Sequence, residues 1–208
     1  MNVLGPLRGT RAVLLMAGVA AVSGANRGIP QPLSFEKVYV RVTDFANLSG
    51  HVRAEAEASV QWVFRRAGVE VEFVECRTAP AGTCGKLAGP RDIWLEILQQ
   101  RPKNMPRDPA GFAVLAPSQR LSDSYAAVSF AMVASWAREM NAPEVLVLAA
   151  AIAHELGHLL LCTSSHGRTG IMRQRLDREQ IERMGQGTLL FTDAEAAAMM
   201  ARLRSVQP

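Results

Sequence analysis

The order of hydrophobic patterns along the chain predicts an α/β domain. Segments in which apolar and polar residues alternate are typical of strands, and segments with apolar residues at helical spacing are typical of helices. Both kinds occur within 208 residues, a length that suits one domain with a sizeable core. Strands are expected at residues 35–42, 69–74, 93–98, 111–115 and 125–130. The last of these runs into a helix by Trp136.

The first strand and the first helix have clear boundaries. Residues 35–42 alternate between apolar and polar side chains and follow a linker at 30–32 that contains two prolines. Residues 48–67 carry helical spacing and end at Gly68, a residue type that commonly terminates helices. Residues 101–109 contain three prolines and therefore predict a loop on the surface.

Two capping patterns mark the starts of later helices. Asn141 is followed three residues later by Glu144, and Thr192 is followed three residues later by Glu195. In a capping box of this kind each of the two side chains bonds the backbone N–H of the other residue. We therefore expect a long apolar helix after Asn141 and a last helix after Thr192.

The apolar helix carries the sequence His154-Glu155-Leu156-Gly157-His158. Residues four apart lie on one face of a helix, so both histidines can bind one ion with Glu155 beside them. Residues 145–153 are almost wholly apolar, and buried ionisable groups are costly unless a partner such as a divalent cation compensates them. Neutral imidazole suits Zn²⁺, and a catalytic zinc takes three protein ligands and keeps one position for water. The pattern predicts one catalytic Zn²⁺ bound by His154 and His158.

His166 is the favoured third ligand. It lies eight residues after His158, so the chain must leave the helix and turn back. The short polar residues at 162–165, with Gly167 following, favour such a turn over further helix.

Three other residues are alternatives for this third position. Cys162 lies four residues after His158 on the same helical face, and thiolate binds zinc well, although free cysteine is more often a small buried apolar residue. Glu179 and Glu182 are candidates because zinc enzymes of the thermolysin type take their third ligand from a glutamate on a later helix.

Residues 141–173 resemble the metzincin clan of zinc endopeptidases, most nearly its matrixin-like branch. The two histidines with their glutamate, the downstream His166 and the segment Gly170-Ile171-Met172 carry the resemblance. By this resemblance Glu155 is the general base, and Met172 is the methionine of a tight turn beneath the metal. The clan places glycine and then the third ligand where this chain has Leu161 and Ser164. His166 is then a ligand shifted by two residues, as in similar secreted bacterial proteins.

The resemblance implies a fold and a reaction. The fold would be a twisted, mostly parallel sheet with an antiparallel edge strand, backed by two long helices and followed by a C-terminal helix. The protein would be a secreted zinc endopeptidase that hydrolyses peptide bonds with a zinc-bound water, Glu155 being the base and Met172 supporting the metal. An edge strand at 111–115 would bind the peptide as an added strand. The alternatives are a secreted zinc-binding protein of this fold without turnover, and a thermolysin-like zincin with Glu179 or Glu182 as ligand.

The N-terminal residues predict export. Arg8 and Arg11 precede an apolar run at residues 12–22, and small residues at 23–25 end it. This order is typical of a secretory signal peptide cleaved after Ala25, and the run is too short to span a bilayer. We expect a secreted or periplasmic protein with a signal peptide at 1–25, a linker at 26–34 and a zinc metallopeptidase domain at 35–208.

Cysteine usage agrees with an oxidising compartment. Cys76 and Cys84 enclose a turn-rich loop whose ends can meet, which predicts a disulfide. Their spacing is wider than that of a zinc knuckle, so a second zinc site is disfavoured. Cys162 is left without a partner.

Charge and hydropathy exclude two classes of partner. The formal net charge of +4 is modest, and the arginines are scattered, so nucleic-acid binding is not predicted. The apolar run at 145–153 is interrupted at once by His154 and Glu155, so no membrane association is expected after removal of the signal. We expect a monomer whose partner is a peptide or protein substrate.

Overall fold

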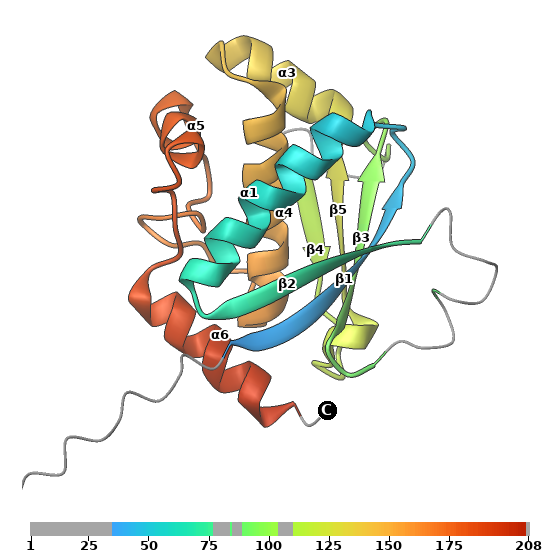
Figure 1. The fold of residues 1–208 in the computed structure, drawn as a ribbon, viewed down its shortest axis with the longest axis vertical. Helices are drawn as coiled ribbons and strands as arrows, with labels where there is room; N and C mark the ends of the chain where they lie inside the picture. Colours follow the sequence, from blue (N-terminus) through green and yellow to red (C-terminus); the bar gives the residue numbers. More distant parts are fainter. Residues whose placement is uncertain (1–34, 77–83, 85–88, 104–109, 207–208) are drawn as a thin grey trace, which may run out of the picture. The chain divides into compact units, whose positions relative to one another are not determined.

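The computed structural model describes residues 35–76, 84, 89–103 and 110–206. The predicted signal peptide at 1–25 and linker at 26–34 lie outside these residues, as does most of the predicted loop at 101–109. Within the described residues the chain forms one sheet with helices on one of its faces (Figure 1).

The sheet contains five strands in the order β2-β1-β3-β5-β4 within the described part of the chain. The strands are β1 (Glu36–Asp44), β2 (Val69–Glu75), β3 (Asp92–Leu98), β4 (Gly111–Val114) and β5 (Tyr125–Ser129). Strand β1 pairs in parallel with β2 and β3, and β3 pairs in parallel with β5. Strand β4 pairs antiparallel with β5 and forms an edge. The prediction of a mostly parallel sheet with an antiparallel edge strand is therefore confirmed.

Alternating side chains give the sheet one apolar face. Val38, Val40 and Val42 of β1 are at most 2% exposed, whereas Tyr39 between them is 37% exposed. Val40 is in register with Ile93 of β3, so the buried side chains line up across neighbouring strands. This apolar set packs against the helices.

Two long helices cover the apolar face, as predicted (Figure 1). They are α1 (Gly50–Arg66) and α4 (Glu144–Leu161), and α4 also packs against the edge strand β4. Ser49 caps α1 by accepting a hydrogen bond from the Val52 N–H. Gly68 follows the helix with a φ of +84°, a conformation that glycine adopts without strain.

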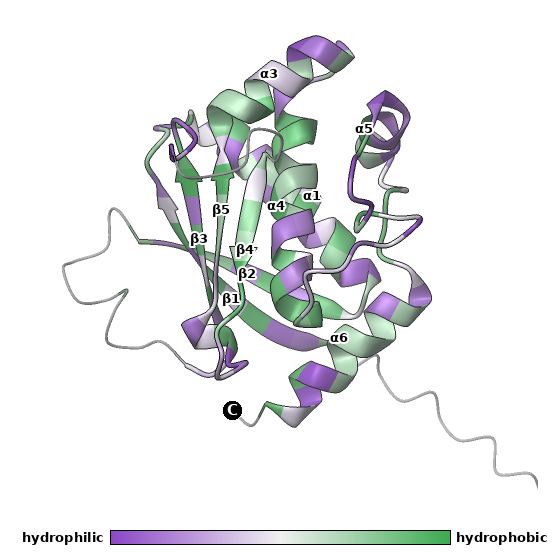
Figure 2. Cartoon of the chain, turned by 180° about the vertical axis from the view of Figure 1, so that it is seen from behind, coloured by the Kyte–Doolittle hydropathy of each residue, from purple (hydrophilic) through white to green (hydrophobic). Residues whose placement is uncertain are grey.

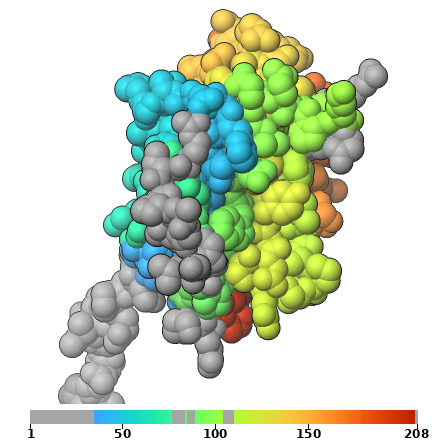
Figure 3. All heavy atoms as spheres, turned by 90° about the vertical axis from the view of Figure 1, so that its right-hand side faces the viewer, coloured from blue at the N-terminus to red at the C-terminus, as the bar shows by residue number. Residues whose placement is uncertain are grey.

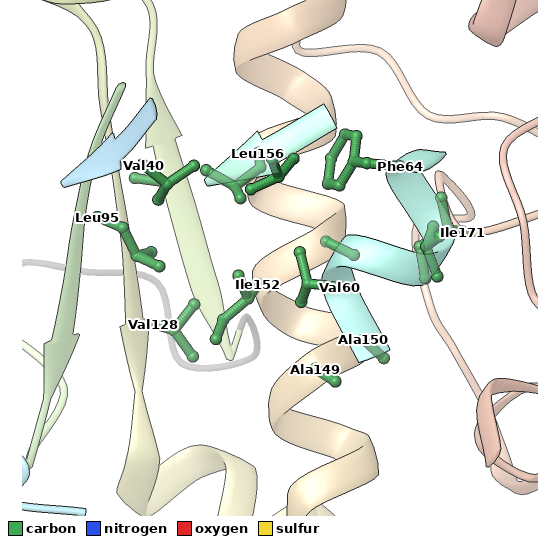
Figure 4. Packing of buried hydrophobic residues seen from close by; sticks show 14 of the residues in the cluster. Val40, Val60, Phe64, Leu95, Val128, Ala149, Ala150, Ile152, Leu156 and Ile171 are labelled. Carbon is green, nitrogen blue, oxygen red and sulfur yellow. The ribbon is translucent and has the colours of Figure 1, made fainter. Parts of the chain in front are cut away.

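Helix α4 lies at the centre of the core. Figure 4 shows Val40, Leu95 and Val128 of the strands facing Ile152 of α4, with Phe64 of α1 on the far side of that helix. Each of these side chains is at most 1% exposed. Full burial of one such side chain contributes about 1.5–3 kcal/mol, so the position of α4 is strongly determined by packing.

Helix α4 is long and apolar enough to cross a membrane, but 72% of it is buried inside the protein. In Figure 2 α4 is green over most of its length, whereas α5 (Arg178–Gly185) is purple. Packing between the sheet and the other helices accounts for the apolar residues of α4.

One expectation about a helix boundary needs correction. Asn141 does not cap α4, because it ends the preceding helix α3 (Phe130–Met140) in a left-handed conformation with φ of 47°. Pro143 occupies the N-cap position of α4 instead. Asparagine tolerates the left-handed conformation well, and the two helices are too close in sequence for it to serve the second one.

The C-terminal part contains one helix that the sequence analysis missed. Helix α5 begins with a capping box in which the Asp177 side chain accepts from Gln180 N and the Gln180 side chain bonds Asp177 N. The capping box of Thr192 and Glu195, which was predicted, opens α6 (Asp193–Ser205). A short 3-10 helix, η1 (Leu121–Asp123), precedes β5.

The second face of the sheet lies opposite the long helices α1 and α4. Figure 3 views this face: blue, green and yellow segments form most of the surface, and orange and red residues from the C-terminal part show only at its margin. Arg41 and Asp92 form an ion pair here with an N–O distance of 2.6 Å, and both are at most 8% exposed.

The predicted disulfide is present. Cys76 follows the end of β2, and its sulfur lies 2.06 Å from that of Cys84. Cys162 is the free cysteine, and it is partly buried.

Candidate metal centre

The three predicted histidines converge. His154 and His158 lie a helical turn apart on α4, and His166 returns to them from the segment that follows the helix. One ring nitrogen from each histidine can be chosen so that all three lie within 4.8 Å of one another. The structure therefore brings together the three side chains that the sequence predicted as ligands.

Backbone carbonyls orient the two helical imidazoles. The Nδ1 atom of His154 lies 2.8 Å from the Ile171 carbonyl oxygen, and that of His158 lies 2.8 Å from the Thr163 carbonyl oxygen. A carbonyl oxygen can only accept, so each Nδ1 donates its proton and each Nε2 keeps a lone pair. Hydrogen bonds of this kind typically orient histidines that bind metals.

The two lone pairs point at the same small volume. The Nε2 atoms of His154 and His158 are 3.0 Å apart, and neither has a proton to donate to the other. This approach of two acceptors is unfavourable unless a positive charge lies close to both. Two nitrogens on one tetrahedral Zn²⁺ are about 3.3 Å apart, given Zn–N bonds of about 2.0–2.1 Å. The donor set therefore fits Zn²⁺, and three histidines leave such an ion one further position.

A left-handed residue brings His166 back to the helix. Cys162 has a φ of 52° at the end of α4, and the Thr163 N–H bonds the His158 carbonyl at 3.2 Å. The ring of His166 then lies 5.2 Å from that of His154 and 4.9 Å from that of His158, measured between centroids. His158 is buried whereas His166 is exposed. Cysteine thus occupies a left-handed position at the end of a helix, where glycine is the usual residue.

Burial keeps the helical histidines in the form that binds metals. The pKa of His154 is lowered to about 4, mainly by burial, and the nearby His158 and His166 contribute to this lowering. Burial also lowers the pKa of His158. Metal binding requires neutral imidazole, so both side chains are ready for it at neutral pH.

Glu155 lies beside the cluster and close to the edge strand. Its side chain is buried, and burial raises its pKa to about 8. A Cβ atom at Gly111 of β4 would lie 2.7 Å from Cγ of Glu155 and 2.8 Å from the Ala127 carbonyl oxygen, closer than such atoms can approach. Only glycine at this position lets the strand pass so near the carboxyl group.

Met172 packs against α4 at Gly157, next to His158. A Cβ atom at Gly157 would lie 2.5 Å from Sδ of Met172 and 2.9 Å from Cε1 of Phe191. The Gly167 N–H donates to the Met172 carbonyl at 2.7 Å, which closes the turn. Met172 is 1% exposed and therefore forms part of the core beneath this end of the helix.

A cleft of about 820 Å³ opens beside the histidines, within the range of about 300–1,000 Å³ typical of ligand sites. One wall comes from β4 and α3 and is largely apolar, with Phe112, Met132 and Trp136 among its residues. The opposite wall comes from the segment after Met172. Between them the cleft follows one face of α4, formed by Val147, Ala150, Ala151, His154, Glu155 and His158.

The alternative ligands lie outside the histidine cluster. The group of close metal-binding atoms found among the described residues contains neither Cys162 nor Glu179 nor Glu182. Glu182 instead pairs with Arg178 on α5 at 2.8 Å. The geometry favours His166 over all three.

Some residues that shape the site were not identified from the sequence. Gly111 and Gly157 carry no local signal of their role, because a contact between distant segments makes the small residue necessary. Trp136 was expected in a helix, but its place in the cleft wall depends on how α3 packs.

Comparison with known proteins supports the fold alone. No family model matches the sequence, and no curated protein matches it. Among solved structures, archaemetzincin from Methanopyrus kandleri has a similar fold, with a TM-score of 0.53 and 13% sequence identity over 81% of this chain and 97% of that chain. The chain thus shares the overall fold of this archaemetzincin.

Proposed function

We propose that the protein is a secreted zinc-dependent endopeptidase. The observation that carries this proposal is the convergence of the Nε2 atoms of His154 and His158, 3.0 Å apart, with His166 closing the group and the buried Glu155 beside it. The cleft next to these residues is large enough for a peptide.

The three histidines would hold the metal. When bound, Zn²⁺ would lower the pKa of a water in the remaining position and polarise a peptide carbonyl. The Ile171 and Thr163 carbonyls would keep the two helical imidazoles aimed at the ion.

Glu155 would move the proton. Its position next to the cluster suits a general base that accepts a proton from water and then passes it to the leaving amine. A purely structural site needs no such group and closes its fourth position with a protein ligand. The edge strand β4, which contacts Glu155 through Gly111, would bind the peptide by adding it to the sheet.

A Glu155→Gln variant tests the proposal. We expect hydrolysis of casein or a quenched peptide to fall by about 10²–10⁴-fold, while zinc content measured by mass spectrometry stays near one ion per chain. Glu179→Gln, which removes an exposed glutamate outside the cluster, is the matched control and should keep full activity. A wild-type protein that holds zinc fully and cleaves no peptide would instead support the zinc-binding protein without turnover.

Secretion is part of the proposal and rests on residues 1–25. N-terminal sequencing of the protein recovered outside the cytoplasm should begin at Asn26. Retention of the full-length chain inside the cell would contradict it.

A further inference from the structure

Two arginines line the cleft directly after the turn that holds Met172. Arg173 and Arg175 both belong to the wall opposite β4 and α3. Arg173 is partly buried, and its backbone is held by a bridge to Gly167 and a hydrogen bond to the Gly170 carbonyl. The location of Arg173 is therefore a defined feature of the wall, and Arg175 follows it two residues later.

Neither guanidinium has an ion-pair partner among the residues that the structure describes. Two of the three carboxylates that follow them in sequence are already used, and within the described part of the chain Glu179 forms no ion pair with either arginine. Asp177 caps α5 by accepting from backbone N–H groups, and Glu182 pairs with Arg178 at 2.8 Å. Arg173 and Arg175 thus present two positive charges to the cleft.

The remaining acidic groups of the cleft do not neutralise these charges. Glu139 of α3 lies on the opposite wall, and no ion pair of the described residues joins it to either arginine. Glu155 is buried beside the histidines and is assigned to proton transfer. The rest of the wall on the side of α3 is mostly apolar, including Met132 and Trp136. One side of the cleft is therefore cationic and the other apolar.

We propose that Arg173 and Arg175 recognise a carboxylate of the peptide, so that the substrates are peptides with an acidic side chain or a free C-terminal carboxylate near the bond that is cut. This inference rests on the proposed peptidase function. The planar guanidinium binds carboxylate through two parallel hydrogen bonds, and partial enclosure by the cleft strengthens the pairing relative to the open surface. A substrate carboxylate would supply the negative charge that no ion pair of the described residues provides to the two arginines.

The probes are fluorescein-labelled and quenched peptides of otherwise neutral sequence. In one pair a single Glu or Gln is moved through successive positions, and in a second pair the C-terminus is either free or amidated. The first pair detects recognition of an acidic side chain, and the second detects recognition of the chain end. Each peptide is assayed for hydrolysis by the zinc-loaded wild type and for binding by the zinc-loaded Glu155→Gln variant.

We expect one pair to show a preference for the carboxylate of about tenfold or more in kcat/KM and in binding affinity, equivalent to about 1.4 kcal/mol. The preference should shrink as salt is raised. In Arg173→Gln/Arg175→Gln the ratio should fall close to one. Arg66→Gln/Arg138→Gln removes the same charge from exposed positions outside the cleft and should keep the preference.

The outcomes separate this inference from the peptidase proposal. Hydrolysis with no preference in either pair, or a preference that survives in Arg173→Gln/Arg175→Gln, overturns the role of the arginines while the peptidase stands. Selective binding without any hydrolysis supports carboxylate recognition by the arginines and refutes the proposed peptidase activity. Arg175→Glu, a single change at an exposed position, should strongly reduce the preference for the carboxylate even if the double variant folds poorly.

Discussion

The two halves of the histidine cluster are held in different ways. His154 and His158 belong to a helix that is packed between the sheet and α1, and their spacing follows from helical geometry. His166 and Met172 belong to an irregular segment held by a few backbone hydrogen bonds and by contacts that require glycine. The comparison shows that a metal site can combine a rigid pair of ligands with a third whose position depends on the surrounding tertiary structure.

Removal of a ligand is expected to have the largest effect, and it compares the two halves directly. His158→Ala and His166→Ala should each weaken zinc binding by more than about a hundredfold, since even residues that only orient ligands contribute about 10–100-fold. Competition with a chromophoric chelator measures the affinity. Glu182→Ala is the control and should keep the metal. Retention of zinc by His166→Ala together with its loss in Glu182→Ala or Glu179→Ala would favour the thermolysin-like alternative.

The contact between the two halves should be sensitive to one methyl group. In Gly157→Ala the new Cβ would lie 2.5 Å from Sδ of Met172, so the turn must move away from the helix. We expect the free energy of unfolding in urea to fall by about 1–2 kcal/mol, with weaker zinc binding, after allowance for the better helix propensity of alanine. Gly50→Ala in α1 has no atom within 4 Å of the new Cβ and should change stability little. Equal stability of the two variants would refute the contact.

Glu155 should make the metal-free protein less stable as pH rises. Its folded-state pKa of about 8 exceeds its ordinary value of 4.5, so between these values the folded state keeps a proton that the unfolded state has lost. Stability therefore falls with rising pH, by up to about 1.4 kcal/mol per pH unit for one proton. From pH 7 to 8.5 His154 is neutral in the folded state, where its pKa is about 4, and mostly neutral when unfolded, where its pKa is near 6.5. We expect a fall of about 1 kcal/mol over this window, which Glu155→Gln should abolish.

Loss of a helix cap is expected to have the smallest effect, and it again separates the two regions. Thr192→Ala and Ser49→Ala each remove the side chain that caps a helix, α6 and α1 respectively, at a cost of about 1 kcal/mol. The Ile171 N–H bonds the Leu190 carbonyl at 3.0 Å, which ties the turn of Met172 to the start of α6. Thr192→Ala should therefore also weaken zinc binding slightly, whereas Ser49→Ala should not. Calorimetric zinc titration of both variants checks this difference.

Sequence patterns predicted the elements that have regular periodicity. The strands and the long helices α1 and α4 were expected within a few residues of their observed bounds, because alternation and helical spacing are local properties. The predicted cap of α4 was wrong because Asn141 ends the preceding helix α3 instead. Helix α5 was missed although its capping box at Asp177 is visible in the sequence.

By itself the sequence determined the chemistry of the site: two histidines one turn apart on an apolar helix, a glutamate directly after the first of them, and a further histidine within reach of a turn. Tertiary structure decided how that chemistry is arranged. The left-handed Cys162 returns His166 to the helix, Gly111 lets the edge strand pass Glu155, and the wall after Met172 presents its arginines to the cleft. These features depend on contacts between segments far apart in the chain, and local periodicity carries no information about such contacts.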